Sequence, residues 1–216
     1  MYIPEHFRES RLDVLHDTMR EIGAATLVTS GSSGLCATHV PIELRRDPAP
    51  LGTICCHFAR GNPHASEIEN ASEVLLVFQG PQCYVTPSWY PSKDTTHKVV
   101  PTLNYVAIHA YGRATLMADQ QGLVAHLGSL TALFERDFEE PWAIDDAPAG
   151  FIEKMARGIV GIEIPLARIE GKNKLSQNRS ADDRAGVVRG LRAAGSESER
   201  AIADLVEATG PNERGA

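Results

Sequence analysis

Apolar residues in the first third of the chain recur with two different periods. Between residues 9 and 22 they recur every three or four positions, which predicts a helix with one apolar stripe. After Gly23, short apolar runs separated by turn residues are typical of strands. The step Asn62–Pro63 favours a helix start, because Asn caps free amide groups and Pro suits the first turn. The predicted elements are a helix at 9–22, strands at 25–29, 35–44 and 53–58 with a turn at 31–34, and a short helix from 62 to about 70.

The remaining two thirds of the chain continue this mixture of periods. The predicted strands are two halves of a hairpin within 74–85, broken at 79–81, a long strand at 105–116 with Val106, Ile108 and Ala110 on one face, and a strand at 160–166. The predicted helices are 119–136, with Leu123, Leu127, Leu130 and Phe134 on one side, a short one at 151–157 after a loop at 137–150, and two around 185–193 and 197–208.

This order differs from the repeating strand–helix–strand units of a parallel sheet. Hairpins and one long strand with helices around them predict an α+β fold built on an antiparallel barrel. From Asp182 onward the composition turns to Ala, Arg, Glu and Gly. We therefore divide the chain into a barrel domain, 1–181, and a helical C-terminal appendage, 182–216. The appendage either packs on the barrel or ends in about ten disordered residues.

The composition limits the cellular compartments and the partners that suit this protein. Apolar residues make up 43% of the chain, enough for a core, and the net charge of −7 gives no overall positive field to attract nucleic acid. Any DNA binding therefore needs a local basic patch or a partner. No apolar run is long enough to span a membrane, and the N-terminus lacks the pattern of a signal peptide. Cysteines at 36, 55, 56 and 83 match no zinc spacing, so we expect free thiols in the cytoplasm rather than disulfides.

Three polar segments are candidates for chemistry. Residues 57–64 end a strand and begin a helix, so Arg60 and free backbone amides there suit a phosphate, or simply form a capped turn. In the segment 84–93, Trp89 either stacks on a planar ring or belongs to a rigid aromatic loop that covers a barrel end or a dimer seam. The segment 171–179 is either a binding loop or a solvated loop.

Other motifs favour no particular chemistry. Asn104 lies at the start of a strand, where Asn is often just a turn residue. Four histidines, at 39, 57, 64 and 109, lie on or near predicted strands, which leaves a haem- or metal-handling barrel open as a third hypothesis. Nucleophilic hydrolysis and dinucleotide binding on a doubly wound sheet have no supporting motif. We assign no catalytic residue and no metal ligand.

Five segments occur together in an order that identifies a family. They are Met1–Phe7, His57–His64, Tyr84–Lys93, Pro101–Tyr105 and Gly171–Arg179. In this order the chain resembles the PaiB-type FMN-binding regulators, over roughly residues 1–190. The resemblance implies a flavin-binding split barrel similar to pyridoxamine-phosphate oxidases. It also implies a homodimer with FMN at the subunit interface, and a role in transcription.

The resemblance also implies a set of FMN-binding residues. His57, Phe58 and Ala59 are expected along the flavin edge, and Arg60, Asn62 and His64 near the phosphate. Trp89, Lys93, Thr102 and Asn104 are expected to approach from an adjacent strand or the partner subunit. Lys174, Ser176, Gln177 and Asn178 are expected to close the site.

The chain departs from the family pattern at three positions. Ala65, Leu103 and Asn173 stand where aromatic residues are usual. Each lost ring removes stacking or packing surface worth about 1 kcal/mol, so we expect weaker FMN binding or a pocket for another planar ligand. The alternative to a regulator is a flavin-dependent oxidoreductase acting on a small molecule, in which the cofactor carries the redox step. DNA binding rests on the family resemblance alone, because Gly186 and Gly190 weaken the one candidate recognition helix.

Overall fold

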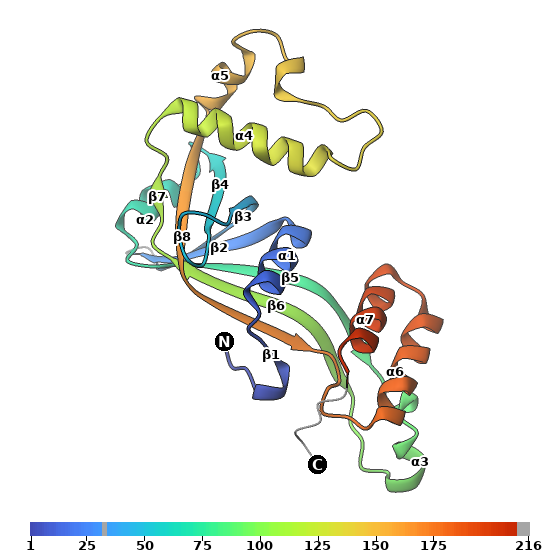
Figure 1. Ribbon diagram of the computed structural model, residues 1–216. Coiled ribbons are helices and arrows are strands. Elements are labelled where there is room, and N and C mark those ends of the chain that lie inside the picture. Colours follow the sequence, from blue (N-terminus) through green and yellow to red (C-terminus); the bar gives the residue numbers. More distant parts are fainter. Residues whose placement is uncertain (32–33, 211–216) are drawn as a thin grey trace. The chain divides into compact units, whose positions relative to one another are not determined.

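The computed structural model describes residues 1–31 and 34–210, so part of the predicted turn at 31–34 and the end of the tail, 211–216, lie outside the described residues. The strands are β1 (Arg8–Glu9), β2 (Ala24–Gly31), β3 (Gly34–Arg45), β4 (Thr53–Ala59), β5 (Val74–Val85), β6 (Thr102–Gly112), β7 (Thr115–Leu116) and β8 (Ile159–Lys174). The α-helices are α1 (Leu12–Ile22), α2 (His64–Asn70), α3 (Ser92–Thr96), α4 (Gln120–Glu135), α5 (Phe151–Ala156), α6 (Ala181–Ala194) and α7 (Glu197–Ala208), shown in Figure 1. Short 3₁₀ helices are η1 (Glu5–Phe7), η2 (Pro87–Trp89) and η3 (Ile144–Asp146).

The strands form one sheet in the order β1-β8-β4-β3-β2-β5-β6. A further pairing of β8 with β6 closes this path into a ring, and β7 pairs with β8. The pairs with a defined register are antiparallel, for example His57 opposite Gly161 in β4 and β8. The prediction of an α+β fold with an antiparallel split barrel and peripheral helices is confirmed.

The chain forms two compact units, each assembled from separate segments. Unit 1 consists of 1–11, 79–108 and 170–216, and unit 2 consists of 12–78 and 109–169. The long strands β5, β6 and β8 each contribute residues to both units. The division into domains at 181 and 182 remains a prediction about which parts fold independently.

Two strand predictions were wrong. The segment 74–85 is one continuous strand, β5, and not a hairpin. Its glycine serves packing instead of a turn: a Cβ on Gly80 would lie 3.1 Å from the Cβ of Val106 in β6. The residues of the expected break nevertheless mark the change from unit 2 to unit 1, which falls between 78 and 79.

The second error concerns the strands around 105–116 and 160–166. β6 begins earlier, at Thr102, and ends at Gly112, and β7 is separate. β8 continues to Lys174, because its end pairs with β1, where Arg8 lies opposite Lys172. The first residues of the expected loop 171–179 are therefore strand residues with fixed positions.

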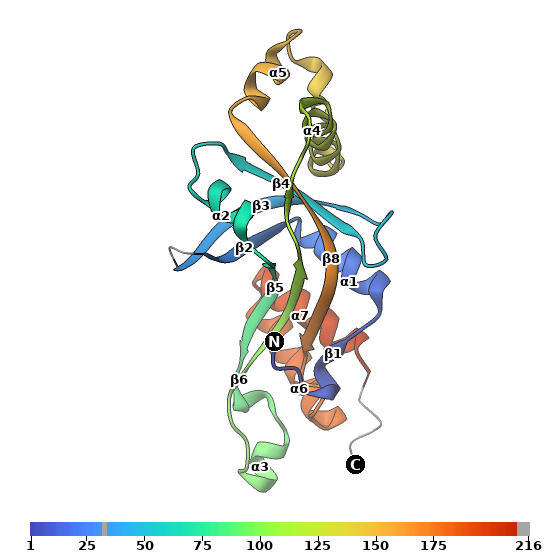
Figure 2. The same ribbon diagram turned by 90° about the vertical axis from the view of Figure 1, so that its left-hand side faces the viewer.

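Unit 1 is built around a core that the C-terminal helices share with the strands. Buried side chains from β5, β6, α6 and α7 form one cluster, made up of Cys83, Val85, Tyr90, Val106, Leu175, Val187, Leu191, Ile202, Ala203 and Val206. Helices α6 and α7 lie side by side in both views (Figures 1 and 2). The two glycines of α6 allow close packing, because a Cβ on Gly186 would lie 2.0 Å from the Trp89 carbonyl oxygen, and one on Gly190 would meet the indole ring.

Unit 2 carries α4 against β3 and α5. The buried residues of α4 are Leu123, His126 and Leu130. The predicted apolar stripe is thus correct at two positions, but Phe134 is 49% exposed, and His126, which the apolar pattern does not single out, occupies the buried face. No helix among the described residues is long and apolar enough to cross a membrane.

Candidate functional site

A small polar pocket lies in unit 1 where β6 begins and β8 ends. We call it the Lys174 pocket; its lining residues are Phe7, Thr102, Asn104, Lys174, Ser176, Asn178 and Arg179. Five of these were expected at the FMN site: Thr102, Asn104, Lys174, Ser176 and Asn178. The fold therefore brings together two sequence segments about seventy residues apart.

The backbone around this pocket is held by side-chain hydrogen bonds. Asn104 is fully buried, and its Nδ2 donates to Ser176 Oγ at 2.9 Å. Ser176 itself has φ of 61°, a left-handed conformation that is uncommon for a residue with a side chain. Such backbone strain persists where the surroundings fix the conformation, and it is concentrated at functional sites.

The pocket carries positive charge without a carboxylate in its lining. Lys174 Nζ donates to Thr102 Oγ1 and, at 2.6 Å, to the Leu103 carbonyl oxygen. Burial lowers the pKa of Lys174, and the nearby positive charges of Lys172 and Arg179 lower it further. Because an anion in the pocket would relieve that repulsion, the site favours an anionic ligand.

Three of the expected FMN-binding residues of unit 1 lie outside the lining of the Lys174 pocket. Gln177 is buried, and its amide is used within its own loop, accepting from Leu175 N and donating to the Asn173 carbonyl oxygen. Trp89 places one face of its ring against Gly190, and Lys93 is exposed in α3. None of the three lines the Lys174 pocket.

The remaining expected residues lie in unit 2, where β4 ends and α2 begins. His64 is fully buried, and its two ring nitrogens are hydrogen-bonded to Thr29 Oγ1 at 2.9 Å and Thr38 Oγ1 at 2.8 Å. Asn62 accepts from the His64 backbone N–H and donates to Thr38 Oγ1. The helix begins at His64 with Pro63 as its N-cap, one residue later than the predicted cap at Asn62. Phe58 stacks on the His64 ring, while Ala59 is exposed at the end of β4. This arrangement favours a structural role for Asn62 and His64.

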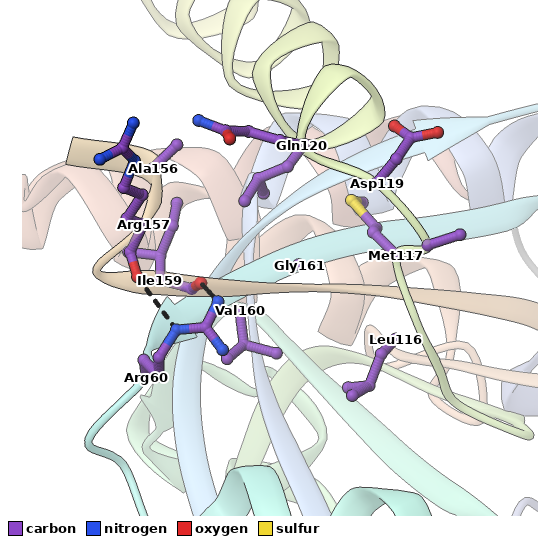
Figure 3. Close-up of a pocket in the computed structure, with 12 residues that line it drawn as sticks. Arg60, Leu116, Met117, Asp119, Gln120, Ala156, Arg157, Ile159, Val160 and Gly161 are labelled. Carbon is purple, nitrogen blue, oxygen red and sulfur yellow. Dashed lines mark hydrogen bonds between the residues drawn. The ribbon is translucent and has the colours of Figure 1, made fainter. Parts of the chain in front are cut away.

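Arg60 lines a second, larger pocket of about 300 Å³, which we call the Arg60 pocket. Its other lining residues are Leu116, Met117, Ala118, Asp119, Gln120, Leu123, Ala156, Arg157, Ile159, Val160 and Gly161. Figure 3 shows the Arg60 guanidinium donating to the carbonyl oxygens of Arg157 and Ile159, each at 3.0 Å. Arg60 therefore holds the start of β8 in place, and its guanidinium forms part of the wall of the pocket.

His57, the last expected residue, belongs to a hydrogen-bonded network that sequence analysis missed. Its Nδ1 lies 3.1 Å from Nε2 of His126, whose Nδ1 lies 2.8 Å from Oε2 of Glu43. Arg45 makes two further hydrogen bonds to Glu43. Burial alone would raise the pKa of Glu43, but the hydrogen bonds from His126 and Arg45 outweigh it and lower the pKa. Among the described residues, no three His, Cys, Asp or Glu side chains are arranged to hold a metal ion.

Comparison with known proteins decides the family. Residues 1–168 match the family described as "Putative FMN-binding domain". The chain belongs to this FMN-binding family. It is 31% identical over 207 residues to the protease synthase and sporulation protein PAI 2 of Bacillus subtilis (strain 168), which covers 96% of this chain and 97% of that protein. An uncharacterized protein of Emericella nidulans is 30% identical over 245 residues, covering 97% and 98%.

Solved structures share the fold of this FMN-binding family member at low identity. The FAD and heme binding protein from Mycobacterium smegmatis superposes with a TM-score of 0.61 at 14% identity, covering 88% of this chain and 80% of that one. The flavocytochrome Anf3 from Azotobacter vinelandii gives 0.60 at 11% identity, covering 85% and 78%. The resemblance to PaiB-type proteins and the assignment of a flavin cofactor are thus supported by the family match, and the fold by these structures.

The geometry of the Lys174 pocket fits one part of a flavin nucleotide. Its volume is about 40 Å³, whereas pockets that enclose a whole cofactor are roughly 300–1,000 Å³. Two cations, two hydroxyls and two amides in its lining match the acceptor oxygens of a phosphate group. The pocket can therefore hold a small anionic group such as a phosphate, and a larger ligand would extend beyond it.

Proposed function

We propose that this FMN-binding protein holds the phosphate of its cofactor in the Lys174 pocket. The observation that carries the proposal is the pair of cations, Lys174 and Arg179, in a pocket without a carboxylate. Hydroxyl and amide groups of Thr102, Ser176 and Asn178 complete a set of donors for phosphate oxygens. The cofactor supplies the redox chemistry, and these side chains bind and orient it.

We further propose a homodimer in which the partner subunit covers the flavin ring. The small volume of the pocket supports this, because most of a bound FMN would otherwise lie exposed to water. The implied family arrangement, with cofactor between two chains, supplies the missing wall. Leu103, 44% exposed next to the pocket, offers an apolar side chain for such a contact.

We propose that this chain acts as a transcriptional regulator in the cytoplasm. The similarity to the protease synthase and sporulation protein PAI 2 supports a regulatory role, and buried free thiols such as Cys55 and Cys56 suit a reducing compartment. Burial raises the pKa of both thiols to about 12, which keeps them protonated and unreactive. Salt-sensitive retention of a specific DNA fragment would support regulation, and retention that is independent of sequence would contradict it.

The cofactor site is tested by replacing one cation. FMN is added in slight excess to the purified protein, which is then desalted and examined by absorbance and by sizing. We expect a retained flavin band and a dimer-sized peak for the wild type. Lys174→Met should weaken FMN affinity at least tenfold, because a charge-assisted hydrogen bond is lost.

Lys93→Met is the matched control, since Lys93 is exposed and lies outside the pocket. Equal FMN affinity of the Lys174→Met and Lys93→Met variants would place the phosphate elsewhere. A monomer that retains FMN with full affinity would contradict the interface site while leaving the family assignment intact.

A further inference from the structure

The network Glu43–His126–His57 connects a carboxylate of unit 2 that is 14% exposed to a half-buried imidazole. His126 is fully buried under α4, and Glu43 is held in place by Arg45. The three groups come from β3, α4 and β4, so three separate elements hold them in line. Nothing in the proposed FMN site uses them.

The hydrogen bonds fix the proton positions when both rings are neutral. Glu43 accepts from His126 Nδ1–H, so Nε2 of His126 is left as an acceptor. That nitrogen in turn accepts from His57 Nδ1–H. Nε2 of His57 therefore carries a lone pair, which makes His57 a base.

The outer nitrogen of His57 is open to a ligand. Among the described residues, His57 makes its side-chain hydrogen bond through Nδ1 and its side chain is only half-buried, so Nε2 is left for a ligand. When His57 Nε2 gains a proton, no hydrogen bond is lost, because the proton between His57 and His126 can move onto His126, which is hydrogen-bonded to Glu43. The pair thus takes up one proton and moves the positive charge next to a carboxylate.

The surrounding charges come from every element in contact with the network. They are Glu43 and Arg45 of β3, the thiol of Cys55 on β4, His126 of α4 and Glu163 of β8, which accepts from Arg45 at 3.1 Å. Burial lowers the pKa of His57, and the positive charge of a protonated His126 lowers it further. At neutral pH the base form therefore predominates.

A cavity of suitable size begins beside the network. Gly161, which is the cross-strand partner of His57, lines the Arg60 pocket (Figure 3). Leu123 of α4, one turn before His126, also lines it. The pocket is lined by the apolar side chains of Met117, Leu123 and Val160, and its polar groups include the guanidinium of Arg60 and the carboxylate of Asp119. A small molecule with both apolar and polar groups suits this lining.

We propose that Glu43 and His126 position His57 as the base of an acid–base site, and that the Arg60 pocket holds its ligand, a small molecule with an ionisable O–H or N–H. In the proton transfer the ligand O–H bond breaks and its electron pair stays on oxygen. The proton forms the Nε2–H bond of His57, and the imidazolium charge balances the ligand anion. His57 is the catalytic residue of this site; Glu43 and His126 are positioning residues.

The first test reads the proton positions directly. ¹⁵N NMR of the histidines above their pKa distinguishes protonated from unprotonated ring nitrogens, and we expect the Nδ1–H tautomer at His57 and at His126. Glu43→Gln should lower the shared pKa of the pair by about one unit, because the carboxylate no longer stabilises the added proton. The Nε2–H tautomer at His57 in the wild type, or an unchanged pKa in Glu43→Gln, would overturn the proposal.

The second test uses 4-nitrophenol, whose ionised form absorbs visible light. Wild-type protein should raise the phenolate absorbance at fixed pH in a saturable manner, with the apparent pKa of the bound probe lowered by about one unit. His57→Gln should still bind the probe without ionising it, and Leu116→Trp, at the pocket rim, should prevent binding. His39→Gln, an exposed histidine on β3, should behave as the wild type.

Each outcome of the probe experiment decides the proposal. No spectral change with the wild type at saturating probe, or ionisation that survives in His57→Gln, would overturn it. Ionisation that survives in Leu116→Trp would place the ligand outside the Arg60 pocket and overturn that part. Since neither test contains FMN, failure of the cofactor proposal would leave them unaffected.

Discussion

In unit 1 the half-buried Lys174 and the buried Arg184 donate to neutral oxygen atoms, whereas in unit 2 Arg45 and His126 donate to the carboxylate of Glu43. Arg184 is 6% exposed and donates to the carbonyl oxygens of Leu175, Val206 and Thr209. Burial lowers the pKa of Arg184, and no other group contributes to that shift. The two units therefore stabilise their charged side chains differently, by neutral oxygen atoms in unit 1 and by a carboxylate in unit 2.

This difference distinguishes a charge that stabilises the fold from a charge that is available to bind a ligand. A cation that faces carbonyl oxygens keeps its charge uncompensated. At Arg184 two of the three carbonyls belong to the end of α7 and the third, of Leu175, follows β8, so the guanidinium holds the C-terminal helices to the core. At Lys174 the same kind of environment opens into a pocket, where an anion can approach. In unit 2 the carboxylate of Glu43 balances the nearby positive charge, so no further anion is needed and the network can instead gain or lose a proton.

The largest expected effect comes from Arg184. Arg184→Met leaves three carbonyl oxygens of unit 1 without their donor, and we expect the free energy of unfolding to fall by about 3 kcal/mol. Arg192→Met on the same helix is the control, because Arg192 is exposed and pairs with Asp204 and Glu207 at the surface. Denaturant titration measures both. Equal loss in the two variants would show that the buried carbonyl contacts of Arg184 do not hold the helices.

A smaller effect is expected from the carboxylate of unit 2. Glu43→Gln removes the counter-charge of Arg45 and His126, and we expect a loss of about 2 kcal/mol at pH 7. The pKa of Glu43 is lowered in the folded state, so this contribution is present above the ordinary pKa of glutamate and is lost as pH falls through the folded value. The difference between wild type and variant should therefore shrink in acid.

Glu163→Gln is the control for this experiment. Glu163 makes one hydrogen bond to Arg45 and its side chain is 42% exposed, so its replacement should cost at most about 1 kcal/mol. Denaturant titrations between neutral and acidic pH measure both variants. A Glu43 contribution that is constant over this range would contradict the network as described.

The smallest expected effect is a change of FMN affinity with pH, which depends on the charge of Lys174. Phosphate binding needs protonated Lys174, whose pKa is lowered by burial and by Lys172 and Arg179. FMN affinity should therefore fall as pH rises through this lowered value, at a lower pH than for an ordinary lysine. Titration of FMN fluorescence across alkaline pH measures this dependence, and Lys174→Met should lack it. The same decline in the variant would assign the dependence to another group.

Much of the fold could be predicted because local patterns specify it. Alternation in β6 placed Val106, Ile108 and Ala110 on one buried face, and the structure confirms this. The helices at the C-terminus were expected within a few residues of their actual bounds. The break predicted within β5 failed, because Gly80 and Pro81 are turn residues in isolation, yet the neighbouring strand β6 keeps the segment extended. Pairing with another strand overrode the local preference.

The candidate site was predictable only in part. The dense polar segment at 171–179 drew attention to Lys174 and Ser176, and the resemblance added Thr102 and Asn104, which the structure brings into one pocket. His126 gave no signal, because a single histidine on an apolar helix face reads as an ordinary residue. Its partners, Glu43 and His57, are 83 and 69 positions away in the chain.

The sequence by itself determined most of the elements, the family and the polar segment that contributes to the Lys174 pocket, because these depend on short-range periodicity and on motifs in a fixed order. The tertiary structure alone decided which charges are compensated. It placed Glu43 against His126 and left Lys174 beside a hydroxyl and a carbonyl oxygen. The reason is physical: the energy of a charge depends on its distance to every other charge and to water, and distances between remote segments exist only in the folded chain.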